Sequence, residues 1–288
     1  MARYGIPWQG SKSRIAEWVV DVLPPSHTLV DLFGGGCAVT HCALLSGKWK
    51  NIIVNDITDS TRVFFAAING EFNGYAACPT REEWFAYRDE DTASALLMSF
   101  GNDRTTYLWS PELEAIKRPA SLMISAGSIW ERYQWYHRFC DALRDYLKTS
   151  TEPPNRITEI EATERLVQLE RVSRLQGLQG LQGDYRLVDI PEGATVYADP
   201  PYRGTANSKR YGEFDFDAFD QWLAGVDFPV FVSEFDAPTG CVEIASTERV
   251  TSMAANSTDT RTERIFVQER FYEQCRPKNL FDFMESGE

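Results

Sequence analysis

The chain has 288 residues, 43% of them hydrophobic, which is enough to bury a core and to form a catalytic domain with a second, smaller domain. It carries 42 acidic and 29 basic residues, a formal net charge of −13, so a polyanionic partner would have to meet basic residues concentrated on one face. No apolar run reaches the roughly 18 residues of a membrane span, and the start of the chain lacks the apolar core of a signal peptide.

The six cysteines are scattered along the chain without a CxxC pair, and only three histidines accompany them. This pattern predicts the reduced thiols of a cytoplasmic protein and no metal site. The sequence therefore predicts neither a metal cofactor nor a membrane partner, and it does not predict an oligomeric state.

The first predicted element is a buried strand over residues 28–33, which runs into Gly34-Gly35-Gly36 and then into a helix over residues 37–46. A second strand, residues 51–54, ends in Asn55-Asp56, where an acid could accept hydrogen bonds from a ribose. The glycines lack GxGxxG spacing, and no basic residue is placed for a pyrophosphate. The pattern favours a nucleoside ligand without phosphate, although a structural turn is the alternative.

Residues 72–183 are too long for a strand-to-helix connection and show a helical pattern. Helices are predicted over residues 81–89, with Thr80 as the cap, and over residues 91–100. A third helix begins at Pro111 and is predicted over residues 111–117. We therefore expect an inserted, mainly helical domain.

Residues 129–147 are rich in aromatic side chains, which we interpret as the core of the small helical domain, with stacking at a base step as the alternative. Basic residues in and near the insertion, and after residue 202, are candidates for phosphate contacts, with an ordinary solvated surface as the alternative. These candidates are Lys117, Arg118, Arg132, Arg203, Lys209 and Arg210.

A polar segment with two prolines, residues 149–155, marks a boundary, and a helix is predicted over residues 159–175. Three Leu-Gln-Gly units follow, ending at Gly183. We interpret this repeat as a connector back to the catalytic domain, and a loop near a nucleic acid is the alternative.

A predicted strand over residues 194–198 delivers the tetrapeptide Asp199-Pro200-Pro201-Tyr202 at its carboxyl end. The prolines fix the backbone direction, so the Asp199 carboxylate and the Pro200 carbonyl become two fixed acceptors for an exocyclic NH2 group. Tyr202 adds a flat face for a heterocycle. A surface turn ended by a half-buried tyrosine is the alternative interpretation.

The remaining pattern predicts a polar loop over residues 203–212, a helix over residues 217–224, and strands over residues 228–233 and 264–268. Alternating strands and helices around an insertion indicate an α/β fold with a mostly parallel sheet of about seven strands and helices on both faces. We expect residues 1–71 and 184–276 to form the catalytic domain, and residues 277–288 to form a flexible tail.

Five segments occur in the order seen in the Dam-like adenine DNA methyltransferases of the D12 class, alpha group, and the chain resembles their phage-encoded members in particular. The segments are Trp8-Gln9-Gly10-Ser11-Lys12, residues 31–36, residues 54–57, Asp199-Pro200-Pro201-Tyr202 and Val232-Ser233-Glu234. The resemblance extends from about Tyr4 to Val267 and is patchy between Asp56 and Asp199. For a phage-encoded member it implies the host cytoplasm as the location.

The resemblance implies a Rossmann-like methyltransferase fold, S-adenosylmethionine as methyl donor, and DNA, in duplex form, as partner. Its implied donor-binding residues are Trp8, Gly10, Lys12, Asp31, Phe33, Gly34, Gly36, Asp56, Ile57 and Asp199. Asp199, Pro200 and Tyr202 would hold the adenine that rotates out of the duplex to receive a methyl on its amino group. The insertion would recognise the target sequence.

One departure concerns Glu234, because many relatives carry asparagine after the serine at this position. This weakens any role for the segment, which we interpret mainly as a core strand over residues 230–232. Methylation of RNA or of a glutamine side chain is an alternative, because the same two acceptors could bind any planar amine or amide. A non-catalytic DNA-binding module with the methyltransferase shape is a further alternative, although the intact Asp199–Tyr202 segment and Asp56 speak against it. An NAD-dependent oxidoreductase is less favoured still, because the phosphate loop is missing.

Overall fold

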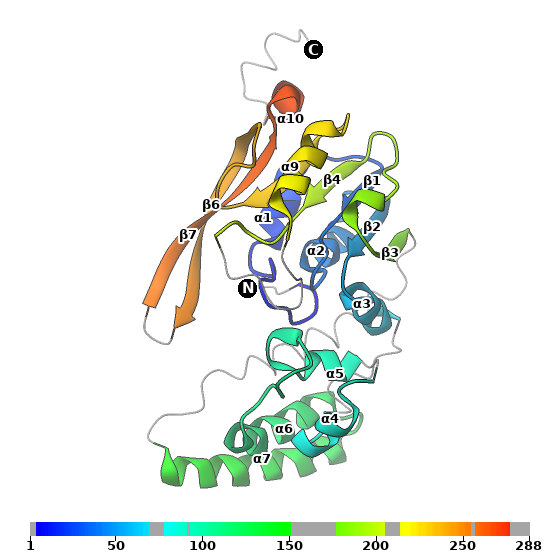
Figure 1. The fold of residues 1–288 in the computed structure, drawn as a ribbon. Coiled ribbons are helices and arrows are strands. Elements are labelled where there is room, and N and C mark those ends of the chain that lie inside the picture. Colours follow the sequence, from blue (N-terminus) through cyan, green and yellow to red (C-terminus); the bar gives the residue numbers. More distant parts are fainter. Residues whose placement is uncertain are drawn as a thin grey trace. The chain divides into compact units, whose positions relative to one another are not determined.

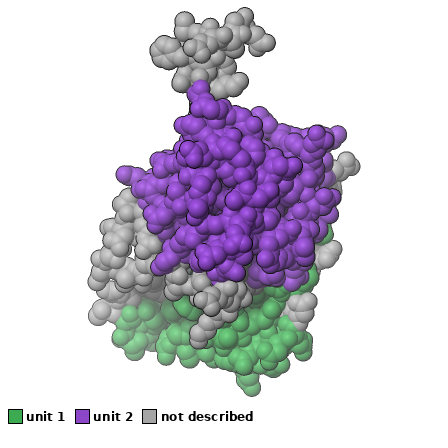
Figure 2. All heavy atoms as spheres, turned by 45° about the horizontal axis from the view of Figure 1, so that its top comes forward, with its two compact units in different colours: residues 1–14, 35–41, 59–176 green, residues 15–34, 42–58, 177–288 purple. Residues whose placement is uncertain are grey.

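The computed structural model describes residues 4–69, 78–90, 93–150, 177–204, 214–254 and 257–276. The chain forms two compact units, coloured separately in Figure 2. Unit 1 comprises residues 1–14, 35–41 and 59–176, and unit 2 comprises residues 15–34, 42–58 and 177–288. The catalytic and inserted domains expected from the sequence remain a prediction.

Unit 2 is built on a seven-stranded sheet with the order β3-β2-β1-β4-β5-β7-β6 (Figure 1). The strands are β1 (Thr28–Asp31), β2 (Asn51–Asp56), β3 (Leu178–Gln182), β4 (Thr195–Ala198), β5 (Val230–Glu234), β6 (Cys241–Ala254) and β7 (Ser257–Gln268). Strands β3, β2, β1, β4 and β5 are parallel, whereas β7 is antiparallel to both β5 and β6. The predicted α/β fold with a mostly parallel, seven-stranded sheet is confirmed.

The strand order separates this sheet from a dinucleotide-binding one. Its first five strands follow the 3-2-1-4-5 order of that class, but an antiparallel β7 stands between β5 and β6 where the classical sheet continues in parallel. The carboxyl ends of β1, β2 and β4 nevertheless meet at one edge, which is where ligands bind in open α/β sheets.

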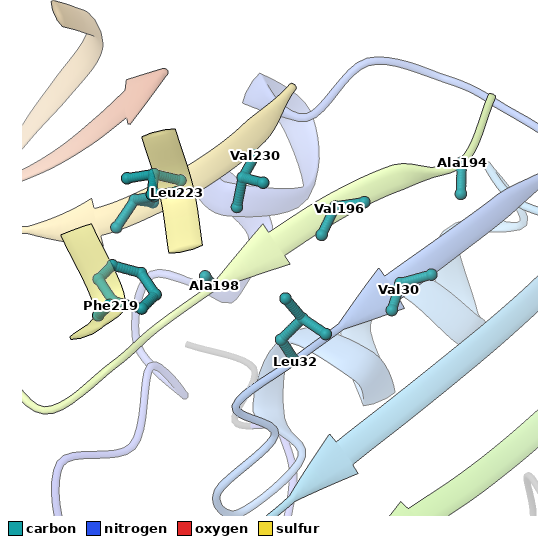
Figure 3. Packing of buried hydrophobic residues seen from close by; sticks show 9 residues of the cluster. Val30, Leu32, Ala194, Val196, Ala198, Phe219, Leu223 and Val230 are labelled. Carbon is teal, nitrogen blue, oxygen red and sulfur yellow. The ribbon is translucent and has the colours of Figure 1, made fainter. Parts of the chain in front are cut away.

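The central strands are apolar because they are covered on both faces. Every residue of β1, β4 and β5 is buried. Helix α9 (Phe216–Gly225) places Phe219 and Leu223 against Val196 and Val230, and Figure 3 shows α9 in front of β4 and β5 with α1 (Ala16–Val22) behind them. Asp215 caps α9 by accepting a hydrogen bond from the backbone N–H of Ala218 at 2.9 Å.

Two strands differ from the sequence prediction. The Leu-Gln-Gly repeat is not a connector over residues 178–182: it forms β3, which pairs in parallel with β2 from Ile52↔Leu178 to Asp56↔Gln182. Strand β6 was not predicted at all, and it forms a long antiparallel pair with β7.

Unit 1 is mainly helical within its described residues. Its helices are α3 (Ser60–Ile68), α4 (Arg81–Tyr87), α5 (Ala93–Leu97), η2 (Phe100–Asn102), α6 (Pro111–Ser125) and α7 (Ile129–Thr149). The cap predicted at Thr80 is confirmed: Thr80 and Glu83 form a reciprocal capping box. Trp84, Tyr107 and Trp109 form a buried aromatic core.

The aromatic side chains of α7 do not form that core. No residue of α7 is buried, and Trp130 and Tyr133 are 75% and 56% exposed. The interpretation of residues 129–147 as a domain core is therefore wrong: α7 lies along α6 (Figure 1), and among the described residues its aromatic side chains stay on the surface.

The helices η4 (Tyr185–Leu187), η5 (Glu269–Phe271) and α10 (Tyr272–Cys275) complete unit 2, and α2 (Ala38–Ser46) carries the chain from one unit to the other. The helix predicted over residues 159–175 and the tail at residues 277–288 lie outside the described residues.

Candidate functional site

Three acidic residues stand at the carboxyl ends of neighbouring strands. Asp31, the last residue of β1, pairs with Val54 on one side and with Tyr197 on the other. Asp56 lies two residues after Val54, and Asp199 lies two residues after Tyr197. The two acids therefore flank the end of β1 at the same edge of the sheet. Two strand spacings separate β2 from β4, which amounts to about 10 Å, the scale of a nucleoside.

Hydrogen bonds hold these strand ends together. The Asn55 side-chain amide donates to the carbonyls of Leu32, at 3.1 Å, and of Gly183, at 3.0 Å. The backbone N–H of Gly34 donates to the Asn55 carbonyl at 2.7 Å. Sequence reasoning placed Asn55 beside the site but gave it no role. Its position at a strand end before an acid was the available signal.

The carboxylate of Asp56 has a fixed orientation. Its Oδ1 accepts hydrogen bonds from the backbone N–H of Thr58 at 2.8 Å and from the Thr58 hydroxyl at 2.6 Å. Asp56 is buried, whereas the adjacent Ile57 is 58% exposed. An oriented acid beside an exposed apolar side chain suits a ribose and its attached base.

Phe33 extends β1 into an aromatic cluster. Its ring centroid lies 5.0 Å from that of Tyr185 and 6.0 Å from that of Phe219. Phe33 is half-buried, so it both packs on the α9 side of the sheet and borders the site edge.

The remaining predicted donor-binding residues lie in unit 1, around the glycine turn. A Cβ atom on Gly36 would lie 2.6 Å from Cβ of Trp8 and 2.7 Å from the carbonyl oxygen of Ile6, so only glycine fits beside this segment. The backbone N–H of Ile6 donates to the Gly36 carbonyl at 2.8 Å. Lys12 is buried, and Gly10 is exposed with a φ of 77°.

The tetrapeptide emerges directly from buried β4. Pro200 is buried, and Asp199 and Tyr202 are half-buried. The Tyr202 hydroxyl donates to Oε2 of Glu263 on β7 at 2.8 Å, and the backbone N–H of Arg203 donates to Oε2 of Glu234 on β5 at 3.0 Å. Glu234 therefore holds the backbone of Arg203, the residue after the tetrapeptide, a role that the interpretation of this segment as a plain core strand did not include.

Burial and neighbouring acids shift the pKa values of the side chains around the tetrapeptide. Burial, together with the carboxylates of Asp199 and Glu263, holds the pKa of Tyr202 well above its ordinary value, and the pKa of Tyr197 is raised in the same way. Burial raises the pKa of Glu234 to about 7; Asp199 adds to this increase, and hydrogen bonds from Phe235 and Arg203 oppose it. Such a site stabilises a cation and repels a phosphate.

The candidate phosphate contacts have diverse surroundings. Lys117 is buried in α6, and Nε of Arg118 donates to the Cys78 carbonyl at 3.0 Å. Arg132 is exposed on α7, and Arg203 forms an ion pair with Asp220. Lys209 and Arg210 lie outside the described residues.

Within the part of the chain that the structure describes, no group of three or more histidine, cysteine, aspartate or glutamate side chains could hold a metal ion. Among these same residues, no helix has the length and apolar character needed to cross a bilayer.

In open α/β sheets of this kind, ligands bind beyond the carboxyl ends of the strands, and the strand-end acids lie at that edge. Residues 8–94 match the model of the D12 class N6 adenine-specific DNA methyltransferases. The match supports the predicted methyltransferase family over this part of the chain. The matched segment contains Trp8, Gly36 and Asp56 and ends before Asp199.

No curated protein matches the chain. Among solved structures, an rRNA methylase from Streptococcus thermophilus is similar at 9% sequence identity with a TM-score of 0.27. The alignment covers 90% of this chain and 96% of the methylase.

Proposed function

We propose that the protein is a site-specific DNA adenine N6-methyltransferase of the Dam-like, phage type, which uses S-adenosylmethionine and acts on an adenine rotated out of duplex DNA. The observation that carries the proposal is the placement of Asp56 and Asp199 on either side of Asp31 at one edge of the sheet. An acid for a ribose and an acid for an amine then stand about two strand spacings apart.

Asp56 and Asp31 would hold the donor through its hydroxyl and amino groups, and Phe33, Gly34 and Ile57 would border it. In unit 1, the resemblance and the family match support the same assignment for Trp8, Gly10, Lys12 and Gly36. The acids at the strand ends of unit 2 suit a cationic ligand without phosphate. When bound, S-adenosylmethionine supplies a methyl group on a sulfonium that is already a strong electrophile.

The tetrapeptide would hold the target. The Asp199 carboxylate and the Pro200 carbonyl accept the two hydrogens of the adenine amino group, and the ring of Tyr202 stacks on the base. The Asp199 carboxylate, the Pro200 carbonyl and the acidic surroundings of Tyr202 would stabilise the positive charge that the amino nitrogen gains when it receives the methyl group, and this nitrogen would then release one proton to water.

The negative site edge also separates this proposal from a dinucleotide-dependent oxidoreductase. A pyrophosphate needs helix N–H groups or basic side chains. The described strand ends offer Asp31, Asp56 and Asp199 instead, which suits a cationic donor. The exposed aromatic side chains and Arg132 on α7 support a nucleic acid as partner, because a stacking surface with a nearby cation suits bases and phosphates.

The test is base-resolved sequencing of modified DNA from cells that express the wild-type chain or the Asp199→Ala variant. We expect N6-methyladenine in one sequence context with the wild-type chain, and at least about a hundredfold less with the variant. If the DNA stayed unmodified while RNA or a protein glutamine was methylated, DNA would not be the substrate. A wild-type chain that binds no donor in a titration would contradict the enzyme assignment.

A further inference from the structure

Two buried glutamates from neighbouring strands converge on the segment that follows Pro201. Glu234 ends β5 and Glu263 lies on β7, and both are 2% exposed. The antiparallel pairing of Glu234 with Arg264 places Glu263 beside Phe235, just beyond the end of β5. Both carboxylates therefore reach the tetrapeptide from the sheet, on the side opposite to β1.

Glu234 uses both of its oxygens. Oε2 accepts the backbone N–H of Arg203 at 3.0 Å, and Oε1 accepts the backbone N–H of Phe235 at 2.8 Å. A carboxylate can join two N–H donors from separate segments, whereas a carboxamide offers one oxygen and turns its NH2 group toward the second donor. The glutamate at this position thus performs a task that an asparagine could not perform in the same way.

Glu263 holds the side chain of Tyr202, the residue before Arg203. Its Oε2 accepts the Tyr202 hydroxyl at 2.8 Å, and the ring of Phe235 meets the Tyr202 ring edge to face, with centroids 4.6 Å apart. Arg264 fixes Phe235 in turn by donating to its carbonyl. The ring of Tyr202 is thereby held at its tip and at its side, which fixes the plane on which a base would stack.

We propose that Glu234 and Glu263 are positioning residues that fix the Tyr202 ring and the Arg203 peptide in the orientation that the target base requires. The proposal rests on the proposed methyl transfer to adenine. A fixed ring plane lowers the entropy lost when the base stacks, and it keeps the amino nitrogen in line with the methyl group. Neither glutamate needs to touch the base or the donor for this effect.

The first experiment needs no substrate. Amide hydrogen exchange of the full chain, followed by mass spectrometry, should show residues 202–204 protected in the wild type and exchanging at least about tenfold faster in Glu234→Gln. Glu269→Gln is the matched control, because Glu269 is exposed and lies on η5 just after β7. Unchanged exchange in Glu234→Gln would overturn the role of Glu234.

The second experiment measures methyl transfer to DNA by Glu263→Ala, Glu263→Gln, Tyr202→Phe and the double variant Tyr202→Phe/Glu263→Ala. Glutamine retains an oxygen acceptor, so we expect it to restore activity, whereas alanine should lower kcat/KM for DNA by about 10- to 100-fold. Donor affinity should stay unchanged. The double variant should be no worse than Glu263→Ala, because both changes remove the same hydrogen bond.

Additive losses, or an equal loss of donor binding, would overturn the positioning role of Glu263 and indicate general destabilisation. The two proposals fail separately. A wild-type chain that shows the protected segment but methylates no DNA would refute the proposed function. Active wild-type enzyme with unaffected glutamate variants would refute the positioning role alone.

Discussion

Asp56 and Asp199 flank Asp31, each two residues beyond a residue that pairs with it across the sheet. Their chain positions are far apart, yet the parallel register brings them to one edge. There, Asp56 would bind the ribose of a nucleoside ligand, and Asp199 would bind the amino group of the target adenine. This relationship underlies both the expected chemistry and the first prediction.

Replacing Asp56 with alanine should weaken donor binding about 10- to 100-fold, because a charge-assisted hydrogen bond to a ribose hydroxyl would be lost. Isothermal titration with S-adenosylmethionine measures this change. The Asp89→Ala variant is a control, since Asp89 is exposed after α4. Equal donor affinity in wild type and Asp56→Ala would contradict the ribose assignment.

Gly36→Ala should destabilise the protein by about 1–3 kcal/mol, because the new Cβ would overlap Cβ of Trp8 and the carbonyl oxygen of Ile6. Denaturant unfolding followed by tryptophan fluorescence measures the loss. In the control Gly225→Ala, the new Cβ meets no atom within 4 Å, so this variant should be neutral or slightly more stable. Similar stabilities for the two variants would be inconsistent with the close approach at Gly36.

Two tryptophans of unit 1 should respond differently to removal. Trp84 is fully buried and donates from its indole N–H to the Ala95 carbonyl at 3.0 Å, so Trp84→Ala should cost about 3–5 kcal/mol. Trp130 is 75% exposed, and Trp130→Ala should stay within about 0.5 kcal/mol of wild type. Thermal unfolding compares them. A large loss for Trp130→Ala would restore the interpretation of α7 as a core helix.

Stability should depend on pH through Glu234. Burial, with a contribution from Asp199, raises its pKa from 4.5 to about 7 in the folded state. Between these values the folded chain binds the proton more tightly than the unfolded chain, so this contribution to stability is present at low pH and is lost as the pH rises toward 7.

The loss across that pH window is about 2 kcal/mol once solvent screening is included. Glu234→Gln has no such group, so the difference in unfolding free energy between wild type and variant should shrink or reverse as the pH rises from about 5 to about 8. Urea titrations at several pH values measure it. Parallel pH curves for the two proteins would rule out this titration.

The sequence predicted the parts of the fold whose apolar pattern is set by burial on both faces. Strands β1, β2, β4 and β5 are near-continuous apolar runs, and each was located to within about two residues. Strand β3 escaped prediction because it is a half-exposed edge strand rich in glutamine and glycine, held by its pairing with β2. Strand β6 likewise depends on β7 for its structure.

The site residues that belong to short sequence motifs could be predicted. The contacts between residues that are distant in the sequence could not. The order of Asp31, Asp56 and Asp199 at strand ends follows from the motifs. The contact between Tyr202 and Glu263 joins segments separated by β5 and β6, and no spacing rule connects them. Acidic residues within a strand pattern also look like surface positions, although Glu263 is buried.

The late position of β3 constrains how the protein emerges from the ribosome. All the segments of unit 1 lie before Gly177, so that unit can assemble while synthesis continues. At that stage the sheet has only β1 and β2, a parallel pair without β3 or β4 beside it. Vectorial synthesis therefore favours completion of the helical unit first, with the tetrapeptide and its two glutamates added to the sheet in the last third of translation.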